Sequence, residues 1–317
     1  MSFFTFCKLC QQLSWFVMKI KYSKEVAGAI KLNVPILALE STILTHGMPY
    51  PASLHLAKEM VRLCRDGNVV PALIAVVKGT PTIGLDDKQL EKLLQQKKLH
   101  KISKRELGLA MSKGWSGGTT VSSTMFLSSH ANIKTFSTGG IGGVHFGLNE
   151  TLDISQDLFS LSETPQIVIS AGIKAVLDIP KTCELLETLG VTVLGYKTNE
   201  VPTFYSRSSG IKNLVEVNSV SEIVSSFNFN LDLGLKSATL VFNPIPAADE
   251  VPKNEIDLFV EKAQKQLRKE NISGKHITPF LLDYVLKKTS GQSLEANISL
   301  AVNNVKLGVK IAKGLTS

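Results

Sequence analysis

The chain has 317 residues, of which 44% are hydrophobic and 20% are charged, and its formal net charge is +8 at pH 7. This composition is that of an ordinary soluble protein with enough chain for a large core. The longest uninterrupted apolar run, residues 69–77, is too short to span a bilayer. Aromatic residues make up only 7% and are not interleaved with basic clusters, which argues against a stacking surface for single-stranded RNA.

The N-terminal stretch, residues 1–24, contains four lysines and no acidic residue, and polar residues interrupt its apolar part. It is a poor signal peptide and a weak organellar targeting sequence, so we expect a disordered extension before a single domain at 25–317. The spacing of Cys7 and Cys10 is interpreted as incidental rather than as a metal or redox pair. With Cys64 and Cys183 they form no disulfide framework, which favours a reducing compartment such as the cytoplasm.

Short apolar runs typical of strands alternate with longer amphipathic stretches typical of helices. The predicted strands lie at 34–41, 71–79, 133–143, 166–172, 191–197 and 237–244. The predicted helices lie at 51–67, 87–98, 175–190, 255–271 and 293–314. Near-continuous apolar strands between helices favour a sheet covered on both faces. We therefore expect an α/β fold: one α/β/α sandwich domain with a mixed, mostly parallel central sheet.

Polar residues follow several of these strands, where ligands bind in open α/β sheets. They are Glu40, Lys78, the glycine-rich stretch 137–145, and Lys174. Lys174 has two readings: its stem packs on the core while its head reaches water, or it is a nucleophilic amine with a lowered pKa. Because these polar residues are expected to converge at one edge of the sheet, we give the two interpretations of Lys174 equal weight. A carboxyl at position 40 can act as acid and base, or cap a helix or turn.

Two further segments carry weaker signals. In "STGGIGGVHFG" (137–147), the glycines permit close backbone approach, an anion-binding nest or simply a tight turn. In "LDISQDL" (152–158), Asp153 and Asp157 offer oxygen ligands for Mg²⁺ or Mn²⁺, although spacing alone favours an ordinary helix start.

Taken together, the motifs resemble those of the pseudouridine-5′-phosphate glycosidase family, which includes indigoidine-operon A-type proteins. The resemblance covers about residues 30–314 and is carried by "ALESTILTHGMPYP", "KISKREL", "GGTTVSSTM", "STGGIGGVHFG", "DISQDL", "SAGIKAVLDIPKTCELLETLGV", "NPIPAADE", "GKHITPFLL" and "SLEANISL". It implies reversible cleavage of pseudouridine 5′-phosphate to uracil and ribose 5-phosphate, with Mn²⁺ or another divalent cation. It also implies a homotrimer and a metabolic link to a separate pseudouridine kinase.

Matched motif by motif, the resemblance implies that Lys174 is the nucleophile, Glu40 the proton donor and Asp153 the metal ligand. The substrate contacts that it implies are Lys101, Val121, Thr138, His145, Ser155, Gln156, Asp157 and Asn297. Gln156 stands where a small residue is common in the family. The implied chemistry suits a C–C glycosidic bond, which has no departing oxygen to protonate. Glu40 protonates the ribose ring oxygen, Lys174 adds to C1′, and its lone pair expels uracil to leave a Schiff base that water releases.

Two other functions are weighed against this one. The first is another Schiff-base lyase or aldolase that acts on a phosphosugar, which differs because only the glycosidase releases uracil. The second is a catalytically silent RNA-binding or scaffold protein, against which the presence of Lys174, Glu40 and Asp153 argues. We expect a small-molecule substrate and neither a nucleic-acid nor a membrane partner.

Overall fold

The computed structural model describes residues 19–316 apart from 271, 273–276 and 290. The strands of this part are β1 (Lys21–Tyr22), β2 (Ile36–Leu39), β3 (Val70–Val77), β4 (Thr80–Ile83), β5 (His100–Ile102), β6 (Gly117–Thr119), β7 (Thr135–Ser137), β8 (Ile167–Ser170), β9 (Thr192–Tyr196), β10 (Val215–Val217) and β11 (Thr239–Phe242). They form one sheet in the order β1-β4-β3-β2-β7-β8-β11-β9-β10, and β6 and then β5 join it through β3. The ladders β3·β4 and β3·β6 are antiparallel, and the others are parallel.

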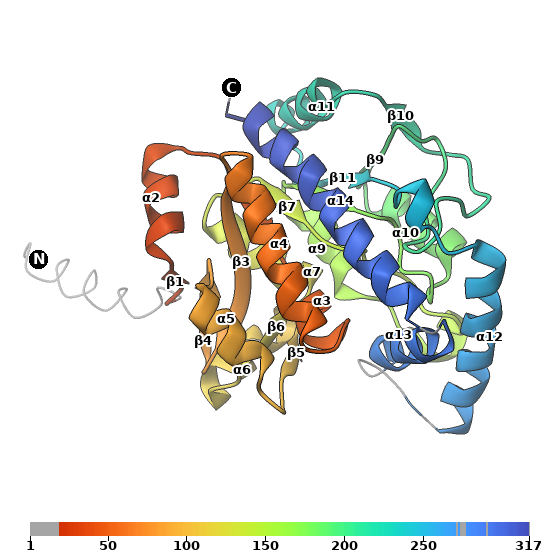
Figure 1. Cartoon of the computed structure of the whole chain (residues 1–317). Coiled ribbons are helices and arrows are strands. Elements are labelled where there is room, and N and C mark those ends of the chain that lie inside the picture. Colours follow the sequence, from red (N-terminus) through yellow and green to blue (C-terminus); the bar gives the residue numbers. More distant parts are fainter. Residues whose placement is uncertain (1–18, 271, 273–276, 290, 317) are drawn as a thin grey trace, which may run out of the picture.

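The helices are α2 (Lys24–Leu32), α3 (Thr42–His46), α4 (Ala52–Asp66), α5 (Asp87–Leu94), the short η2 (Lys104–Glu106), α6 (Leu107–Lys113), α7 (Val121–His130), α8 (Leu148–Thr151), α9 (Gln156–Glu163), α10 (Ile179–Thr188), α11 (Val220–Asp232), the short η3 (Ala247–Asp249), α12 (Lys253–Lys269), α13 (Ile277–Lys288) and α14 (Gln292–Gly314). Helices α4 and α14 pack together on one face of the sheet, and α7 and α9 pack together on the other (Figure 1). The predicted α/β/α sandwich with a mixed, mostly parallel sheet is therefore confirmed. Within the described residues, no helix has the length and apolarity needed to cross a bilayer.

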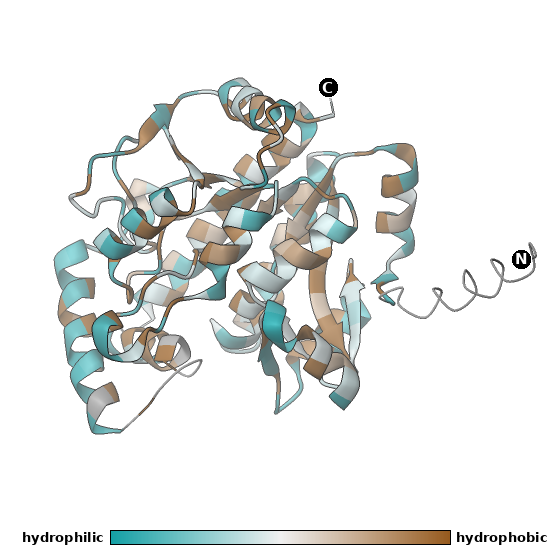
Figure 2. Cartoon of the chain, turned by 180° about the vertical axis from the view of Figure 1, so that it is seen from behind, coloured by the Kyte–Doolittle hydropathy of each residue, from teal (hydrophilic) through white to brown (hydrophobic). Residues whose placement is uncertain are grey.

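The central strands are apolar along their whole length because helices cover both faces. Strand β3 reads "VPALIAVV" and only its two end residues are incompletely buried, while β7, β8 and β11 are buried throughout. Hydrophobic residues accordingly concentrate on the central strands and on the inner sides of the helices (Figure 2). A strand with polar alternation would place polar groups against one of the helical layers, which is why these runs lack it.

The most important feature for the site is the unequal length of β2 and β3. Strand β2 pairs with β3 only as far as Leu39, opposite Leu73, whereas β3 continues to Val77. Beyond that point β6 takes the place of β2 along β3, with Gly118 opposite Ala75. The chain that leaves β2 must then turn away from the sheet, and this turn carries Glu40 and α3 past β6 and β5.

The start of the chain corrects one expectation. Residues 21 and 22, which were predicted to lie in a disordered extension, form β1 and pair with Thr82 and Ile83 of β4. The Ser23 hydroxyl then caps α2 by accepting a hydrogen bond from the Val26 amide at 3.1 Å. Pairing with β4 satisfies backbone N–H and C=O groups of β1. The composition of the segment does not reveal this pairing. Residues 1–18, with Cys7 and Cys10, lie outside the described residues.

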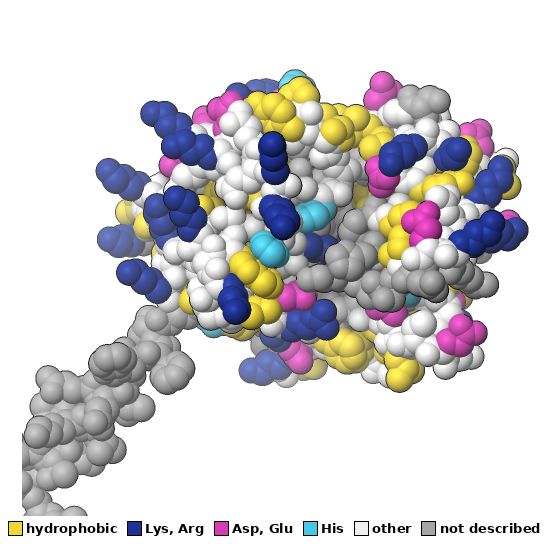
Figure 3. Space-filling view, turned by 90° about the horizontal axis from the view of Figure 1, so that it is seen from below, with side chains coloured by type: hydrophobic (Ala, Val, Ile, Leu, Met, Phe, Trp, Pro, Cys, Tyr) yellow, Lys and Arg dark blue, Asp and Glu magenta, His cyan; other side chains and the backbone are white. Residues whose placement is uncertain are grey.

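Charged side chains are dispersed, as the sequence indicates. In the view from below, Lys and Arg side chains are spread over the face with Asp and Glu among them (Figure 3). Of the cysteines in the described part, Cys64 and Cys183 are both free thiols. Burial raises the pKa of the Cys64 thiol to about 12 and that of Cys183 to about 11, so both are poor nucleophiles.

Candidate active site

The turn after β2 is fixed by a buried hydroxyl. The Ser41 hydroxyl donates to the Ile74 carbonyl oxygen of β3 at 2.6 Å and accepts from the Thr119 amide of β6 at 3.0 Å. Gly118 lets α3 approach this strand, because a Cβ there would lie 2.2 Å from Thr45 Oγ1 and 2.9 Å from the Ser41 carbonyl oxygen. The packing of α3 on β6 thus places Glu40 beside Lys101, which is opposite Gly118 in the β5·β6 ladder.

Glu40 is a buried carboxyl with one close hydrogen bond. It is 5% exposed, and Thr138 Oγ1 donates to its Oε1 at 2.5 Å. Burial raises the pKa of Glu40, while the positive charge of Lys174 and the Thr138 hydrogen bond oppose that rise. A carboxyl with a raised pKa keeps its proton to higher pH and is suited to donate it.

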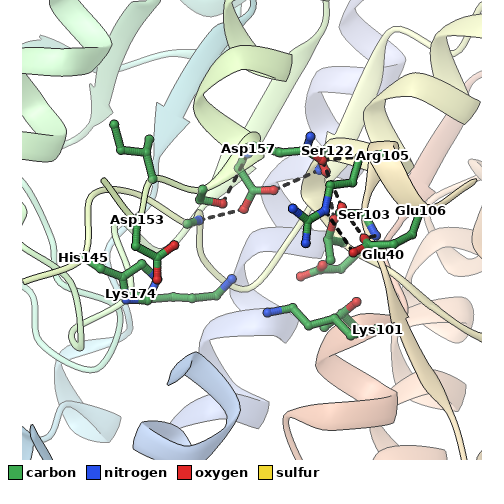
Figure 4. A pocket seen from close by; sticks show the side chains of 16 residues that line it. Glu40, Lys101, Ser103, Arg105, Glu106, Ser122, His145, Asp153, Asp157 and Lys174 are labelled. Carbon is green, nitrogen blue, oxygen red and sulfur yellow. Dashed lines mark hydrogen bonds and ion pairs between the residues drawn. The ribbon is translucent and has the colours of Figure 1, made fainter. Parts of the chain in front are cut away.

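Two lysines lie close to the Glu40 carboxyl. The side chains of Lys174 and Lys101 point toward one another, with Asp153 and His145 beside the former and Glu40 beside the latter (Figure 4). Burial lowers the pKa of Lys101, and the neighbouring charge of Lys174 lowers it further. Two cations in one buried site favour the loss of a proton, which gives the site an amine that can act as a base or as a nucleophile.

Two cavities meet at these groups. The first, of about 200 Å³, is mostly polar and is lined by Glu40, Thr42, Lys101, Ser103, Arg105, Glu106, Thr120, Ser122, Gly142, His145, Asp153, Ile154, Ser155, Gln156, Asp157 and Lys174. The second is more apolar and is lined by Glu40, Thr42, Ile43, His46, Gly47, Lys101, Gly139, Gly140, Lys174, Phe204, Leu282 and Asn297. Glu40, Thr42, Lys101 and Lys174 line both. The site therefore offers a polar half and an apolar half, with a proton donor and amines at their junction.

Asp157 holds the glycine-rich stretch in place. Its Oδ1 accepts from the Ser122 amide at 3.0 Å and its Oδ2 accepts from the Gly142 amide at 2.9 Å. A Cβ at Gly142 would lie 2.3 Å from Ser155 Oγ, so only glycine allows this approach. The amides of Ile141, Gly142, Val144 and His145 all donate to protein acceptors. The close backbone approach is confirmed, and the anion-binding nest is wrong for these amides because the protein itself takes up their donors.

Asp153 has an oxygen without a protein partner. Its Oδ2 is buried and has no hydrogen-bond partner within the part of the chain that the structure describes. Burial lowers the pKa of the neighbouring His145, and the negative charge of Asp153 opposes that lowering. Among the described residues, no three His, Cys, Asp or Glu side chains come together in a way that would hold a metal ion. A metal ion at this place would therefore take few ligands from the described residues.

A hydrogen-bonded network lies along the wall of the first, polar cavity. The Ser103 hydroxyl donates to Glu106 Oε2 at 2.5 Å and lies 2.9 Å from Gln156 Oε1, which also accepts from the Arg105 amide at 3.2 Å. The side chain of Gln156 thus joins the start of α9 to η2. This gives the side chain a structural role.

Comparison with known proteins identifies the family of this chain. Residues 25–314 match the family model described as indigoidine synthase A like protein. The chain belongs to this family. It is 45% identical over 294 residues to a protein of Petrotoga mobilis, which covers 93% of this chain and 96% of the relative. It is 46% identical over 290 residues to one of Mesorhizobium japonicum, covering 92% and 95%. Both relatives are named pseudouridine-5′-phosphate glycosidase.

Two solved structures share the fold of this indigoidine synthase A like chain. The first is the indigoidine synthase A-like protein of Thermotoga maritima, with a TM-score of 0.86 and 33% identity over 94% of this chain and 97% of that one. The second is the prealnumycin C-glycosynthase AlnA in complex with ribulose 5-phosphate, with a TM-score of 0.87 and 30% identity over 95% and 98%. The fold is therefore that of the family.

Most of the predicted site residues come together in this family member. The first cavity is lined by Glu40, Lys101, His145, Asp153, Ser155, Gln156, Asp157 and Lys174, and the second by Asn297, whose Oδ1 is buried without a partner in the described residues. Thr138 lines neither cavity and stands behind Glu40, and Val121 is a core side chain that is 1% exposed. The expectation that Lys78 lies with these residues at the edge of the sheet is wrong. Strand β3 extends beyond the end of β2, so Lys78 lies exposed in the β3–β4 turn.

Sequence reasoning did not select several further lining residues, and four of them carry polar side chains close to Lys101 or Glu40 in sequence. Ser103, Arg105 and Glu106 lie in "KISKREL", of which only Lys101 was selected, because a charged run is usually a solvated surface. Thr42 lies two residues after Glu40 and lines both cavities. Its nearness in sequence to Glu40 was the available signal.

Proposed function

We propose that this chain cleaves the C–C glycosidic bond of pseudouridine 5′-phosphate, reversibly, to uracil and ribose 5-phosphate. The curated relatives at 45% and 46% identity carry the name of that activity. The observation that carries the proposal is the junction itself, where Glu40 and Lys174 line a polar and an apolar cavity together. A phosphosugar suits the polar half and a pyrimidine base the apolar half, which puts the scissile bond between them.

In the proposed reaction, the raised pKa of Glu40 favours its protonated form, and the carboxyl protonates the ribose ring oxygen as the ring opens. The amine of Lys174 adds to C1′ of the opened sugar. Its nitrogen lone pair then forms a C1′=N bond as uracil departs, and water hydrolyses this Schiff base to ribose 5-phosphate. Lys101, with its lowered pKa, faces Lys174 and can take up the proton that the attacking amine must lose.

We also propose that Asp153 anchors a divalent cation, with Mn²⁺ as the first candidate. Its Oδ2 is buried without a partner in the described residues, and a carboxylate oxygen is the ligand that hard divalent ions take. A single protein carboxylate fits an ion that keeps most of its waters. When bound, the ion would add positive charge beside the phosphosugar. The residues present therefore fit the ion.

The family resemblance further leads us to propose a homotrimer, a cytoplasmic location, and supply of the substrate by a separate pseudouridine kinase. A mass measurement in solution by light scattering would test the first of these. A mass of one or two chains would contradict the trimer without touching the proposed reaction.

The proposed reaction is tested by incubating the purified chain with pseudouridine 5′-phosphate and Mn²⁺ and following uracil by chromatography. We expect uracil and ribose 5-phosphate in equal amounts, and no uracil from Lys174→Ala. A different Schiff-base lyase on a phosphosugar is the alternative, since the same fold binds ribulose 5-phosphate in AlnA. Turnover of phosphosugars without any release of uracil would favour that alternative.

A further inference from the structure

Thr42 stands out from its neighbours because its hydroxyl has no partner among the described residues. The flanking Ser41 hydroxyl donates to the Ile74 carbonyl oxygen, and Thr45 Oγ1 donates to the Ser41 carbonyl oxygen at 3.0 Å. The Oγ1 of Thr42 is buried and makes no hydrogen bond within the part of the chain that the structure covers. Leaving a buried hydroxyl unpaired costs about 1–3 kcal/mol, so a site that keeps one has a use for it.

The position of Thr42 indicates which part of a substrate it meets. Among the described residues, only Glu40, Lys101 and Lys174 accompany it in lining both cavities. Helix α3 contributes Thr42 alone to the polar cavity, but Thr42, Ile43 and His46 to the apolar one, which Gly47 just after the helix also lines. Thr42 therefore lies at the junction, on the side of the base, where an atom next to the scissile bond would be within its reach.

We propose that the Thr42 hydroxyl donates a hydrogen bond to the C4 oxygen of the departing uracil. This role rests on the function proposed above. C5 carries the bond to C1′, and C4 is its neighbour in the ring, so the C4 oxygen is the polar atom of the base nearest to the bond that breaks. A neutral donor fixed at the point where negative charge develops stabilises the transition state more than the bound substrate.

The step balances as follows. The N1 proton moves to C5 in the lysine adduct, which leaves an N1=C6 double bond. The Lys174 nitrogen lone pair then forms C1′=N, the C1′–C5 bond breaks, and its electron pair enters C4=C5 as the C4 carbonyl becomes an oxyanion. The proton released by the resulting iminium returns to N1, the ring electrons regain C5=C6 and C4=O, and the products are uracil and the neutral imine. Thr42 donates a hydrogen bond to the C4 oxyanion and transfers no proton.

Thr42→Val tests the role because it keeps the shape of the side chain and removes the hydroxyl. The single-turnover rate of uracil release should fall about 10- to 100-fold, with KM within about twofold of the parent value. Thr42→Ser should restore most of the rate. Ser160→Ala is the matched control, since Ser160 Oγ is also buried without a partner in the described residues but lines neither cavity. It should leave the rate unchanged.

A second measurement separates a role toward uracil from a general effect on the lysine. Borohydride trapping of ribose 5-phosphate on the enzyme forms the same imine without uracil. Thr42→Val should trap the sugar at the parent rate. Equal slowing of trapping and of uracil release would overturn the proposal, as would an unchanged release rate. If the parent enzyme released no uracil at all, the proposed function would fail first and this role with it, while intact parent activity confines any failure to Thr42.

Discussion

Thr138→Val should change the pH dependence of the reaction without removing a group that reacts. The Thr138 hydroxyl donates to Glu40 Oε1 at 2.5 Å. That bond favours the carboxylate and so lowers the pKa of Glu40 against the effect of burial. Valine has nearly the same shape but no donor, so the pKa of Glu40 should rise. The backbone should stay in place, because the Asn304 side-chain amide donates to the Thr138 carbonyl oxygen at 2.8 Å.

The size of the change follows from the energy of the lost bond. A hydrogen bond to a charged group contributes about 1.5–3 kcal/mol, and about 1.4 kcal/mol corresponds to one pH unit of titration. A proton donor works only while protonated, so activity falls as pH rises through its pKa. The alkaline limb of kcat/KM should therefore move to higher pH by about 1 to 2 pH units in Thr138→Val.

The assay is uracil release from pseudouridine 5′-phosphate at saturating Mn²⁺, measured across the stable pH range of each variant. Ser128→Ala is the control, because the Ser128 hydroxyl is buried and bonds to the Thr124 carbonyl oxygen at 2.7 Å, away from both cavities. It should lower thermal stability and leave the alkaline limb in place. An alkaline limb that stays fixed or moves to lower pH in Thr138→Val would refute the role of Glu40 as the proton donor.

Three other outcomes are expected. Borohydride with ribose 5-phosphate should attach the sugar to Lys174, as peptide mass mapping would show; an adduct on Lys101 with full activity of Lys174→Ala would contradict the mechanism. Asp153→Asn should lose most Mn²⁺ binding in calorimetry while remaining folded, and parent-like binding would exclude Asp153 as the anchor. Gly118→Ala should lower stability by about 1–3 kcal/mol and impair uracil release, because its Cβ would lie 2.2 Å from Thr45 Oγ1. Gly108→Ala, with nothing within 4 Å of the added Cβ, should not destabilise the protein, and equal Tm losses in both glycine variants would contradict this reason.

The elements of the fold were largely predictable because their signals are local. The run at 71–79 corresponds to β3 at Val70–Val77, and the amphipathic stretch at 293–314 corresponds to α14 at Gln292–Gly314. The run at 133–143 gave only β7, three residues long, since the glycines after it leave the ladder. Strand β6 was not predicted, because "GGT" carries no apolar pattern and the place of the strand depends on its pairing with β3.

The sequence by itself determined the alternation of strands and helices, and the matched motifs named Glu40, Lys174 and Asp153 as candidates. The first inference rests on hydrophobic periodicity and the second on the resemblance of the motifs to those of a family, and both are readable along a chain. Only the tertiary structure decided which groups meet. Lys101 faces Lys174 from β5 because β6 replaces β2 along β3, and Asn297 reaches the second cavity from the last helix. Burial and neighbouring charge, which raise the pKa of Glu40 and lower that of Lys101, arise only when distant segments pack together.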